Sequence, residues 1–382
     1  MRCRIRAAAA ILIAAAAVLL PASRASADQD REQQWHLRAL NVAAAHRVST
    51  GAGVTVAVID TGVEPHPDLR RNLLSGADAT SQNQSNGQED RVGHGTGMAG
   101  VIAAHGKSRG NGILGIAPGA KILPIRCQRG DRPAASEGEA VAAGVEWAVA
   151  NGAKVINLSF AAGPSARLTR AIDAARAADV VIVAAAGNRP RDFLITVPAV
   201  LPGVVAVGAT SRNGNKASVS VSGSQLSLMA PGVEIYSTGR DGKYRRSTAG
   251  TSSSSAIVAG AAALVRSKFP DLSAAEVVHR LTATATDKGA PGRDREYGYG
   301  VVNLVAALTA DVPPLAASGA PATPSASAVA PIPSSTPDVA APPSSEPDNR
   351  SFAVGGGIGV VLLLGAVLVA LLIRRRRHAP PA

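Results

Sequence analysis

Between residues 28 and 310 the sequence predicts an α/β fold, in which a central, mainly parallel sheet is flanked by helices. Short runs rich in valine, isoleucine and alanine alternate with longer alanine-rich or amphipathic stretches, as expected for parallel strands joined by helices. The segment of about 280 residues is also within the range that one such sheet can organise. We therefore expect a single folded domain.

Six short apolar runs are the predicted strands of this sheet: Thr55–Ile59, Lys121–Ile125, Lys154–Leu158, Val180–Ala184, Val204–Ala209 and Leu228–Ala230. They are short and apolar throughout, which is typical of strands covered on both faces. Five longer stretches are the predicted helices: Thr96–Ala104, Glu137–Ala150, Leu168–Ala178, Ser252–Phe269 and Ala274–Thr284. Their alanine-rich or amphipathic composition favours helices over strands.

The first 27 residues have the composition of a secretory signal peptide. Arg2, Arg4 and Arg6 precede an apolar run from Ala7 to Leu20, and Ala25-Ser26-Ala27 supplies the small residues of a cleavage site. An uncleaved membrane anchor is the alternative, although the apolar run is short for a span. We expect cleavage after Ala27 and a folded domain at residues 28–310.

The C-terminal region predicts a spacer, a membrane span and a short tail. Residues 311–350 are rich in proline, alanine and serine, so they form a predicted disordered linker. Residues 351–373 are a predicted transmembrane helix, because the run from Phe352 to Ile373 is uncharged and apolar. Four arginines open the tail at residues 374–382, which places the C-terminus in the cytoplasm and the domain outside a cell membrane.

The net charge and the number of cysteines bear on two questions, whether the chain binds nucleic acid and whether it forms disulfides. Of the formal charge of +12, four arginines lie in residues 1–27 and four in 374–377, so about +4 remains for the rest. This gives no support for a nucleic-acid partner. Cys3 belongs to the signal peptide, so the mature chain keeps only Cys127, a predicted buried residue that cannot form an internal disulfide.

Three separated segments carry the residue types of a nucleophilic hydrolase. Asp60 ends a predicted strand, His94 lies between two glycines, and Ser252 begins a predicted helix. In such a site the serine attacks a carbonyl, the imidazole moves its proton, and the carboxylate fixes the imidazole tautomer. Taken singly, the aspartate could be a turn residue and the serine a helix cap. Four consecutive serines, 252–255, also leave the identity of the nucleophile open.

Asn188 is a candidate for stabilising the oxyanion, because it follows a predicted strand in Ala184-Ala185-Ala186-Gly187-Asn188. A side-chain amide there could donate to the oxyanion together with the backbone amide of Ser252, which has no helical partner at a helix N-terminus. By itself, Gly-Asn after a strand would be only a turn.

These motifs together resemble those of the subtilisin-like serine peptidases (subtilases, S8). The resemblance is carried by six segments in the right order: Val56–Gly62, Gly93–Ala99, Asn157–Ser159, Ala185–Asn188, Gly250–Ser252 and Gly298–Asn303. The order Asp, His, Ser along the chain is that of subtilisin.

The resemblance implies a three-layer subtilisin-like fold with Asp60, His94 and Ser252 as the catalytic triad. It resolves the choice of serine, because the family nucleophile directly follows Gly-Thr, and it implies that Asn188 is the oxyanion donor. It further implies a substrate cleft, whose residues would be Ser159, Phe160, Ala161, Ala185 and Gly187.

The order of the chain's segments resembles that of the mycosins, membrane-anchored subtilases associated with type VII secretion. That resemblance implies a type VII secretion complex as a partner, and a short N-terminal extension around Trp35 that packs on the domain. The chain departs from its relatives at Ala256, where subtilases usually have proline, and it lacks the disulfides typical of mycosins. Some subtilases bind calcium and Asp68 matches one ligand position, but the loop His105–Asn111 has no carboxylates. We therefore expect no metal and no other cofactor.

The sequence thus predicts a secreted, membrane-tethered serine endopeptidase that acts on protein or peptide substrates. A competing hypothesis is a scaffold or assembly factor of a secretion complex that keeps the subtilase fold without needing proteolysis. An esterase with the same triad is disfavoured, because the Gly-x-Ser-x-Gly motif of the α/β-hydrolases is absent.

Overall fold

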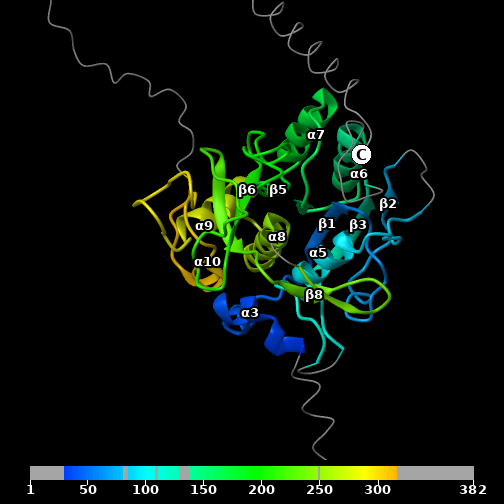
Figure 1. Ribbon diagram of the computed structural model, residues 1–382, viewed down its shortest axis with the longest axis horizontal. Helices are drawn as coiled ribbons and strands as arrows, with labels where there is room; N and C mark the ends of the chain where they lie inside the picture. Colours follow the sequence, from blue (N-terminus) through cyan, green and yellow to red (C-terminus); the bar gives the residue numbers. More distant parts are fainter. Residues whose placement is uncertain (1–29, 81–84, 108–110, 129–136, 248–249, 316–382) are drawn as a thin grey trace, which may run out of the picture. The chain divides into compact units, whose positions relative to one another are not determined.

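The computed structural model describes residues 30–80, 85–107, 111–128, 137–247 and 250–315. These residues form one compact unit around a seven-stranded sheet (Figure 1). All neighbouring strands of this sheet pair in parallel, in the order β2-β3-β1-β4-β5-β6-β7. The strands are β1 Thr55–Asp60, β2 Ala77–Asp78, β3 Lys121–Arg126, β4 Val155–Leu158, β5 Val181–Ala185, β6 Val205–Thr210 and β7 Leu226–Pro231.

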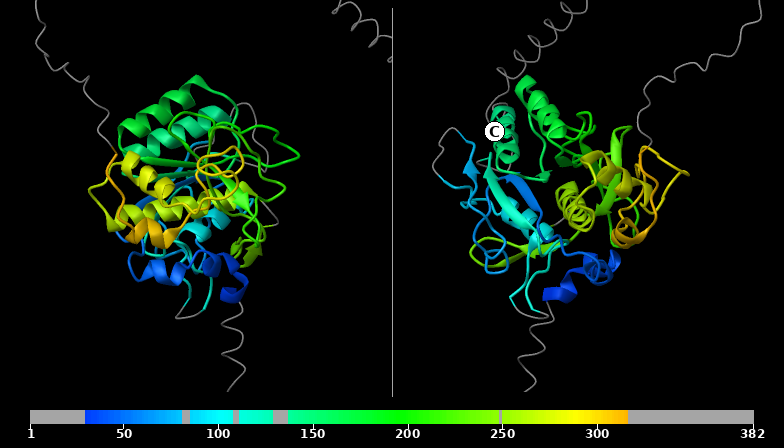
Figure 2. Two further views of the ribbon diagram at one scale, coloured as in Figure 1. Left: turned by 90° about the vertical axis from the view of Figure 1, so that its left-hand side faces the viewer. Right: turned by 180° about the vertical axis from the view of Figure 1, so that it is seen from behind.

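Helices cover both faces of the sheet, so the fold has the three layers that the sequence predicts. On one face lie α5 (His94–Ala103) and α8 (Thr251–Lys268), and on the other lie α6 (Glu137–Ala150) and α7 (Ala166–Ala177) (Figure 2). Further helices are α3 (Trp35–Ala39), α4 (Val42–His46), α9 (Ala274–Ala283) and α10 (Leu304–Thr309). This arrangement confirms the predicted α/β class.

The central strands are mostly apolar because their two faces contribute to two separate cores. In β1, Val56 and Val58 pack in the core below α5 and α8, whereas Ala57 and Ile59 pack in the core below α6 and α7. Successive side chains of a strand point to opposite faces, so a strand covered on both sides cannot alternate apolar and polar residues.

The N-terminal extension packs on the domain, as predicted. The Gln34 side chain exchanges two hydrogen bonds with the backbone of Leu114, at 2.9 and 3.0 Å. The Trp35 indole donates to the Val233 carbonyl oxygen at 3.1 Å, and only 7% of the residue is exposed. The extension is therefore part of the folded structure.

The structure corrects the sequence prediction at several element boundaries. Helix α5 begins at His94, not Thr96, because the backbone turns into the helix at Gly93, whose φ of 84° suits glycine. Sequence patterns did not predict β2, nor the antiparallel hairpin of β8 (Tyr236–Thr238) and β9 (Tyr244–Arg246). Strands of two or three residues are too short to show a periodicity.

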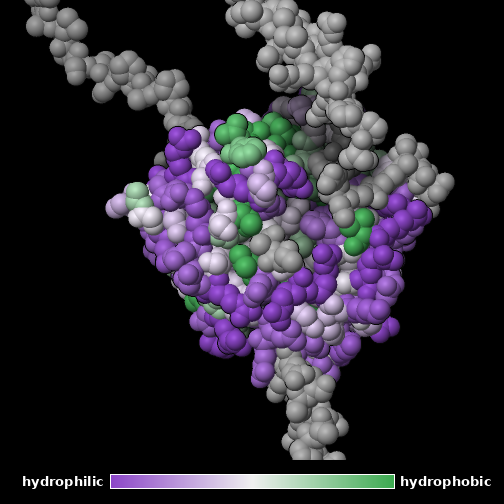
Figure 3. All heavy atoms as spheres, viewed as in Figure 1, coloured by the Kyte–Doolittle hydropathy of each residue, from purple (hydrophilic) through white to green (hydrophobic). Residues whose placement is uncertain are grey.

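The face seen in Figure 3 is mostly hydrophilic, with small separated apolar areas. Cys127 is buried, as predicted. Within the described ranges no helix is long and apolar enough to cross a membrane. The predicted signal peptide (1–27), nearly all of the predicted linker (311–350) and the predicted span (351–373) lie outside these ranges, as does the tail.

Candidate active site

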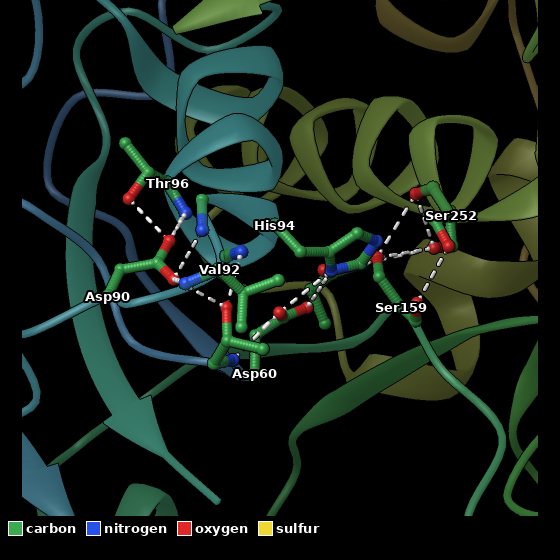
Figure 4. A network of polar contacts seen from close by, with 12 residues as sticks. Asp60, Asp90, Val92, His94, Thr96, Ser159 and Ser252 are labelled. Atoms are coloured by element: carbon green, nitrogen blue, oxygen red, sulfur yellow. Dashed lines mark hydrogen bonds and ion pairs between the residues drawn. The ribbon is translucent and has the colours of Figure 1, made fainter. Parts of the chain in front are cut away.

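Asp60 and His94 meet at the carboxyl end of the sheet. Asp60 is the last residue of β1 and is fully buried, and His94 is the first residue of α5. The His94 Nδ1 lies 2.8 Å from Asp60 Oδ1 and 3.0 Å from Oδ2 (Figure 4). Because an ionised carboxylate can only accept hydrogen bonds, Nδ1 carries the proton and Nε2 is left as an acceptor.

The surroundings of His94 raise its pKa. Burial acts in the opposite direction by favouring the neutral imidazole, but the charge and the hydrogen bond of Asp60 outweigh it. The Arg245 guanidinium lowers the pKa of His94, and the Asp90 carboxylate raises it. His94 therefore accepts a proton more readily than a histidine in water.

Asp90 holds the segment that carries His94. Its carboxylate is buried and accepts from the Thr61 hydroxyl (2.8 Å), the Gly93 amide (2.7 Å), and the amide and hydroxyl of Thr96 (2.9 and 2.6 Å). It also accepts from the amide of Val92 at 3.0 Å. Figure 4 shows this carboxylate beside the first turn of α5. One side chain thus ties the residue after β1 to the start of α5.

Close backbone approach explains the glycine after His94. A Cβ on Gly95 would lie 2.1 Å from the Gly62 carbonyl oxygen and 3.0 Å from the Asp60 Cβ. Any larger residue would push α5 away from β1. The glycine therefore sets the short distance between the carboxylate and the imidazole.

Ser252 is the second residue of α8 and borders the same cavity as His94. The cavity has a volume of about 150 Å³, and Asn188 is also among its lining residues. The Ser252 hydroxyl donates to the Ser159 carbonyl oxygen at 2.7 Å. In the described structure it forms no hydrogen bond with His94, a separation often seen in enzymes without substrate.

Asn188 is oriented by the N-terminus of α8. Its side-chain oxygen accepts from the Thr251 amide at 2.9 Å, so its amide nitrogen is available to donate. Its own backbone amide donates to Asp192 at 2.7 Å. The sequence-predicted residues Asp60, His94, Asn188 and Ser252 are thus brought together.

The five predicted cleft residues lie in two neighbouring segments. Ser159 contacts Ser252 through its carbonyl oxygen and its hydroxyl, and the Gly187 amide donates to the Thr251 hydroxyl at 3.2 Å. Phe160 and Ala185 are largely buried, whereas Ala161 is partly exposed. None of the five lines the cavity shared by His94 and Ser252, so their role in substrate binding stays a prediction.

Sequence reasoning missed two residues beside His94, namely Asp90 and Arg245. An acidic residue four positions before His94, next to a predicted helix, was a visible capping signal. Asp241-Gly242 between short β-branched or aromatic runs was the signal for the β8–β9 hairpin. Ala256, which stands in place of the usual proline, lies buried in the interior of α8, and the helix is continuous there.

Asp68, the candidate calcium ligand, and Arg31 both bind the segment 111–113. One oxygen of the buried Asp68 carboxylate accepts from the Ile113 amide at 2.8 Å. The carbonyl oxygens of Gly112 and Asn111 accept from the Arg31 guanidinium at 3.1 and 3.4 Å. Arg31 therefore places a positive charge at these two carbonyl oxygens, and the absence of a bound metal ion stays a prediction.

Comparison with known proteins agrees with this geometry. A family model described as the subtilase family matches residues 51–300. Subtilisin BL from Lederbergia lenta is 42% identical over 275 residues, covering 72% of this chain and 97% of that protein.

Solved structures are similar as well. MycP1 from Mycobacterium smegmatis has a TM-score of 0.65 and 33% identity, over 73% of this chain and 85% of that one. The MycP3 protease from the type VII (ESX-3) secretion system has a TM-score of 0.64 and 36% identity, over 72% and 88%.

Proposed function

The chain belongs to the subtilase family of serine peptidases, and from this premise we propose that it is a membrane-tethered endopeptidase with Asp60, His94 and Ser252 as its triad. The observation that carries the proposal is that His94, which is hydrogen-bonded to Asp60 at the carboxyl end of β1, and Ser252 border one cavity. Ligands gather at this edge in open α/β folds.

In the proposed reaction, the Ser252 hydroxyl leaves the Ser159 carbonyl oxygen and turns towards His94. Ser252 Oγ attacks the substrate carbonyl carbon while its proton moves to His94 Nε2. His94 then gives this proton to the leaving amine as the C–N bond breaks, which leaves an acyl-enzyme. A water molecule then gives a proton to His94 Nε2 and attacks the acyl carbon. The bond to Ser252 Oγ breaks, His94 returns the proton to Oγ, and the acid leaves, while Asp60 stabilises the imidazolium in both steps.

The tetrahedral intermediate needs donors for its oxyanion. We assign these to the Asn188 side-chain amide and to the backbone amide of Ser252, which lies in the first turn of α8. In subtilisin, removing one side-chain donor of this kind costs about 2.7–4 kcal/mol of transition-state stabilisation. We therefore expect Asn188→Ala to lower kcat with little effect on KM.

Labelling with a fluorophosphonate tests the assignment directly. Wild-type protein should carry one adduct, on Ser252, and Ser252→Ala should carry none. Ser254→Ala is the matched control, because the Ser254 hydroxyl donates to the Ala230 carbonyl oxygen, away from the site. An adduct on any other serine of the wild-type protein would refute the assignment.

The proposed tether rests on the apolar run from Phe352 to Ile373, and the proposed link to type VII secretion rests on similarity to MycP1 and MycP3. We propose an outward-facing domain at a cell membrane with a cytoplasmic C-terminus. The full chain should stay with membranes after alkaline washing, and a chain ending at residue 315 should not.

Complementation tests the secretion link and separates proteolysis from scaffolding. Deletion of the gene should abolish secretion of type VII substrates, and the wild-type gene should restore it. Restoration by Ser252→Ala to the wild-type level would favour the scaffold hypothesis over an essential peptidase. Unchanged secretion after deletion would refute the link.

A further inference from the structure

The cavity beside His94 has apolar, polar and cationic lining residues, and its polar ones include Ser237, Ser247 and Ser253. Met98 and Val101 of α5 and Ile235 before β8 line it, and all three are largely buried. Arg245 of β9 also lines it and is exposed to solvent. A volume of about 150 Å³ is well below the roughly 300–1,000 Å³ of drug-sized ligand sites, so the cavity suits a single side chain.

The hairpin that carries Arg245 is fixed to the helix that carries His94. The Ser237 hydroxyl donates to the Gly97 carbonyl oxygen at 2.8 Å, and the Thr238 hydroxyl donates to the Thr96 carbonyl oxygen at 2.7 Å. In Figure 1, β8 lies beside α5. The hairpin and the imidazole are therefore held in one arrangement.

Arg245 itself is held over the start of α5. Its Nη1 donates to the Gly93 carbonyl oxygen at 2.8 Å. Its Cδ would lie 3.6 Å from a Cβ at Gly97, so the stem of the side chain packs on the glycine face of the helix. The guanidinium is thereby placed before any substrate binds, which reduces the entropy cost of using it.

The positive charge of Arg245 is not neutralised by the described part of the molecule, in which no carboxylate lies within ion-pair distance of it. A second guanidinium, that of Arg240, packs close by: its Cγ would lie 2.9 Å from a Cβ at Gly93. An arginine with four unused N–H donors beside a cavity can bind a carboxylate through two hydrogen bonds.

The chemistry of the proposed reaction identifies which part of the substrate meets this cavity. His94 must reach the amine of the leaving group, so the residues that follow the cleaved bond lie next to the imidazole. The cavity borders His94 on the side of α5 and β9. The predicted cleft segments, 159–161 and 184–187, contribute no lining residue.

We propose that Arg245 is a specificity-determining residue that selects an acidic side chain at one of the two positions following the cleaved bond. The proposal rests on the peptidase function proposed above. The apolar lining residues Met98, Val101 and Ile235 would contact the methylene groups of the substrate side chain, and Arg245 would bind its carboxylate. Substrates would therefore be proteins with aspartate or glutamate just after the cleavage point.

Peptides that differ in one side chain test this proposal. Each carries a single cleavable bond, with Glu, Gln or Lys at the first or the second position after it, and mass spectrometry checks the cleavage point. At one of these two positions, the wild-type enzyme should have a kcat/KM about five- to tenfold higher for the Glu peptide than for the Lys peptide. A ratio of this size is expected for one partly screened ion pair. Arg245→Glu should reverse the preference, and high salt should reduce the wild-type ratio.

The matched control is Arg246→Glu. Arg246 is the next residue of β9, and neighbouring side chains of a strand point to opposite faces. Its guanidinium donates to the Gln33 side chain at 2.8 Å, away from the cavity. This variant makes the same change of net charge and should keep the wild-type ratio. Comparing two peptides with one enzyme also cancels any change in folding or in the pKa of His94.

Two results would overturn the proposal. One is a wild-type ratio within twofold of unity at both positions, and the other is an equal change of ratio in the Arg245 and Arg246 variants. If the wild-type enzyme takes the fluorophosphonate label on Ser252, these results refute only the role of Arg245. Absence of the label would refute the peptidase function itself.

Discussion

At the scale of single residues, the central feature is the hydrogen bond between Asp60 and His94. It fixes the tautomer of the imidazole and raises its pKa against the effect of burial. A general base works only in its neutral form, so activity should rise with pH as His94 loses its proton. The raised pKa places this rise above the ordinary histidine value of 6.5.

Replacing Asp60 by asparagine should move the pH profile in a known direction. Burial and the charge of Arg245 remain, and both lower the pKa of His94. The acid limb of kcat/KM should therefore shift to lower pH, while kcat falls about 10⁴-fold because the tautomer is no longer fixed. Profiles of kcat/KM measured from about pH 5 to 9 check this. An unshifted acid limb would mean that another group sets it.

The sequence predicts the residues that carry chemistry better than those that support them. Asp60, His94 and Ser252 are recognisable because each lies in a short motif of small residues. The fold brings His94 and Ser252 to one cavity and Asp60 to the far side of the His94 ring. Asp90 and Arg245 act through partners more distant in the chain, such as Thr61 for Asp90 and Gly93 for Arg245. The local position of Asp90 indicated a cap, but its bond to Thr61 and the placement of Arg245 over the start of α5 become visible only when the elements are packed.

At the scale of elements, α5 depends on Asp90, which accepts the amides that its first turn leaves without helical partners. In Asp90→Asn one carboxylate oxygen becomes an NH₂ group, which cannot accept hydrogen bonds from the amides and hydroxyls around it. Part of this hydrogen-bond network would therefore be lost. We expect the free energy of unfolding to fall by about 1–3 kcal/mol and kcat to fall about tenfold or more as His94 loses its position. Urea unfolding and steady-state kinetics measure the two effects.

Asp173→Asn is the control for this element. Asp173 lies on α7 and its side chain is 60% exposed in an ion pair with Arg176. Its replacement should change stability by no more than about 0.5 kcal/mol. Equal effects of the two substitutions would show that the Asp90 network has no special role.

The sequence predicts those strands correctly whose apolar residues are buried on both faces of the sheet. The strands β1 and β3 to β7 are continuous apolar runs, and the structure places each within two residues of its predicted bounds. Strand β2 exists because Ala77 and Asp78 pair with Ile125 and Arg126 of β3. A two-residue strand has no pattern of its own, so its partner decides it.

At the scale of the whole molecule, the strand order explains why distant residues converge. Strand β1 lies between β3 and β4 in the sheet. The chain after β1 therefore forms β2 and β3 on one side of β1, and the later strands β4 to β7 lie on its other side. This is the kind of switch point where α/β folds form their sites. Asp60 ends β1 at this point, and α5 and α8 begin beside it.

The N-terminal extension contributes to the stability of the whole domain through Arg31, which donates to the carbonyl oxygens of Gly112 and Asn111. Because this guanidinium supplies the positive charge among these oxygens, a chelator such as EDTA should leave Tm unchanged. Arg31→Ala should lower Tm by about 2–6 °C.

The control for the Arg31 variant is Arg38→Ala, at an exposed position of α3, which should leave Tm nearly unchanged. Calorimetry with and without EDTA measures Tm for the wild-type protein and for both variants. A large fall of Tm in EDTA for the wild-type protein would contradict the assignment of Arg31 and indicate a bound metal ion.

Helix α8 joins Ser252, the proposed nucleophile, to the most deeply buried part of the described structure. Every residue from Ser253 to Arg266 is buried, and the helix runs between the sheet and the remaining helices of its face. Amide protons along it should exchange with deuterium only through global opening. Heating should then abolish catalysis and cooperative structure at the same temperature, with no folded but inactive species in between.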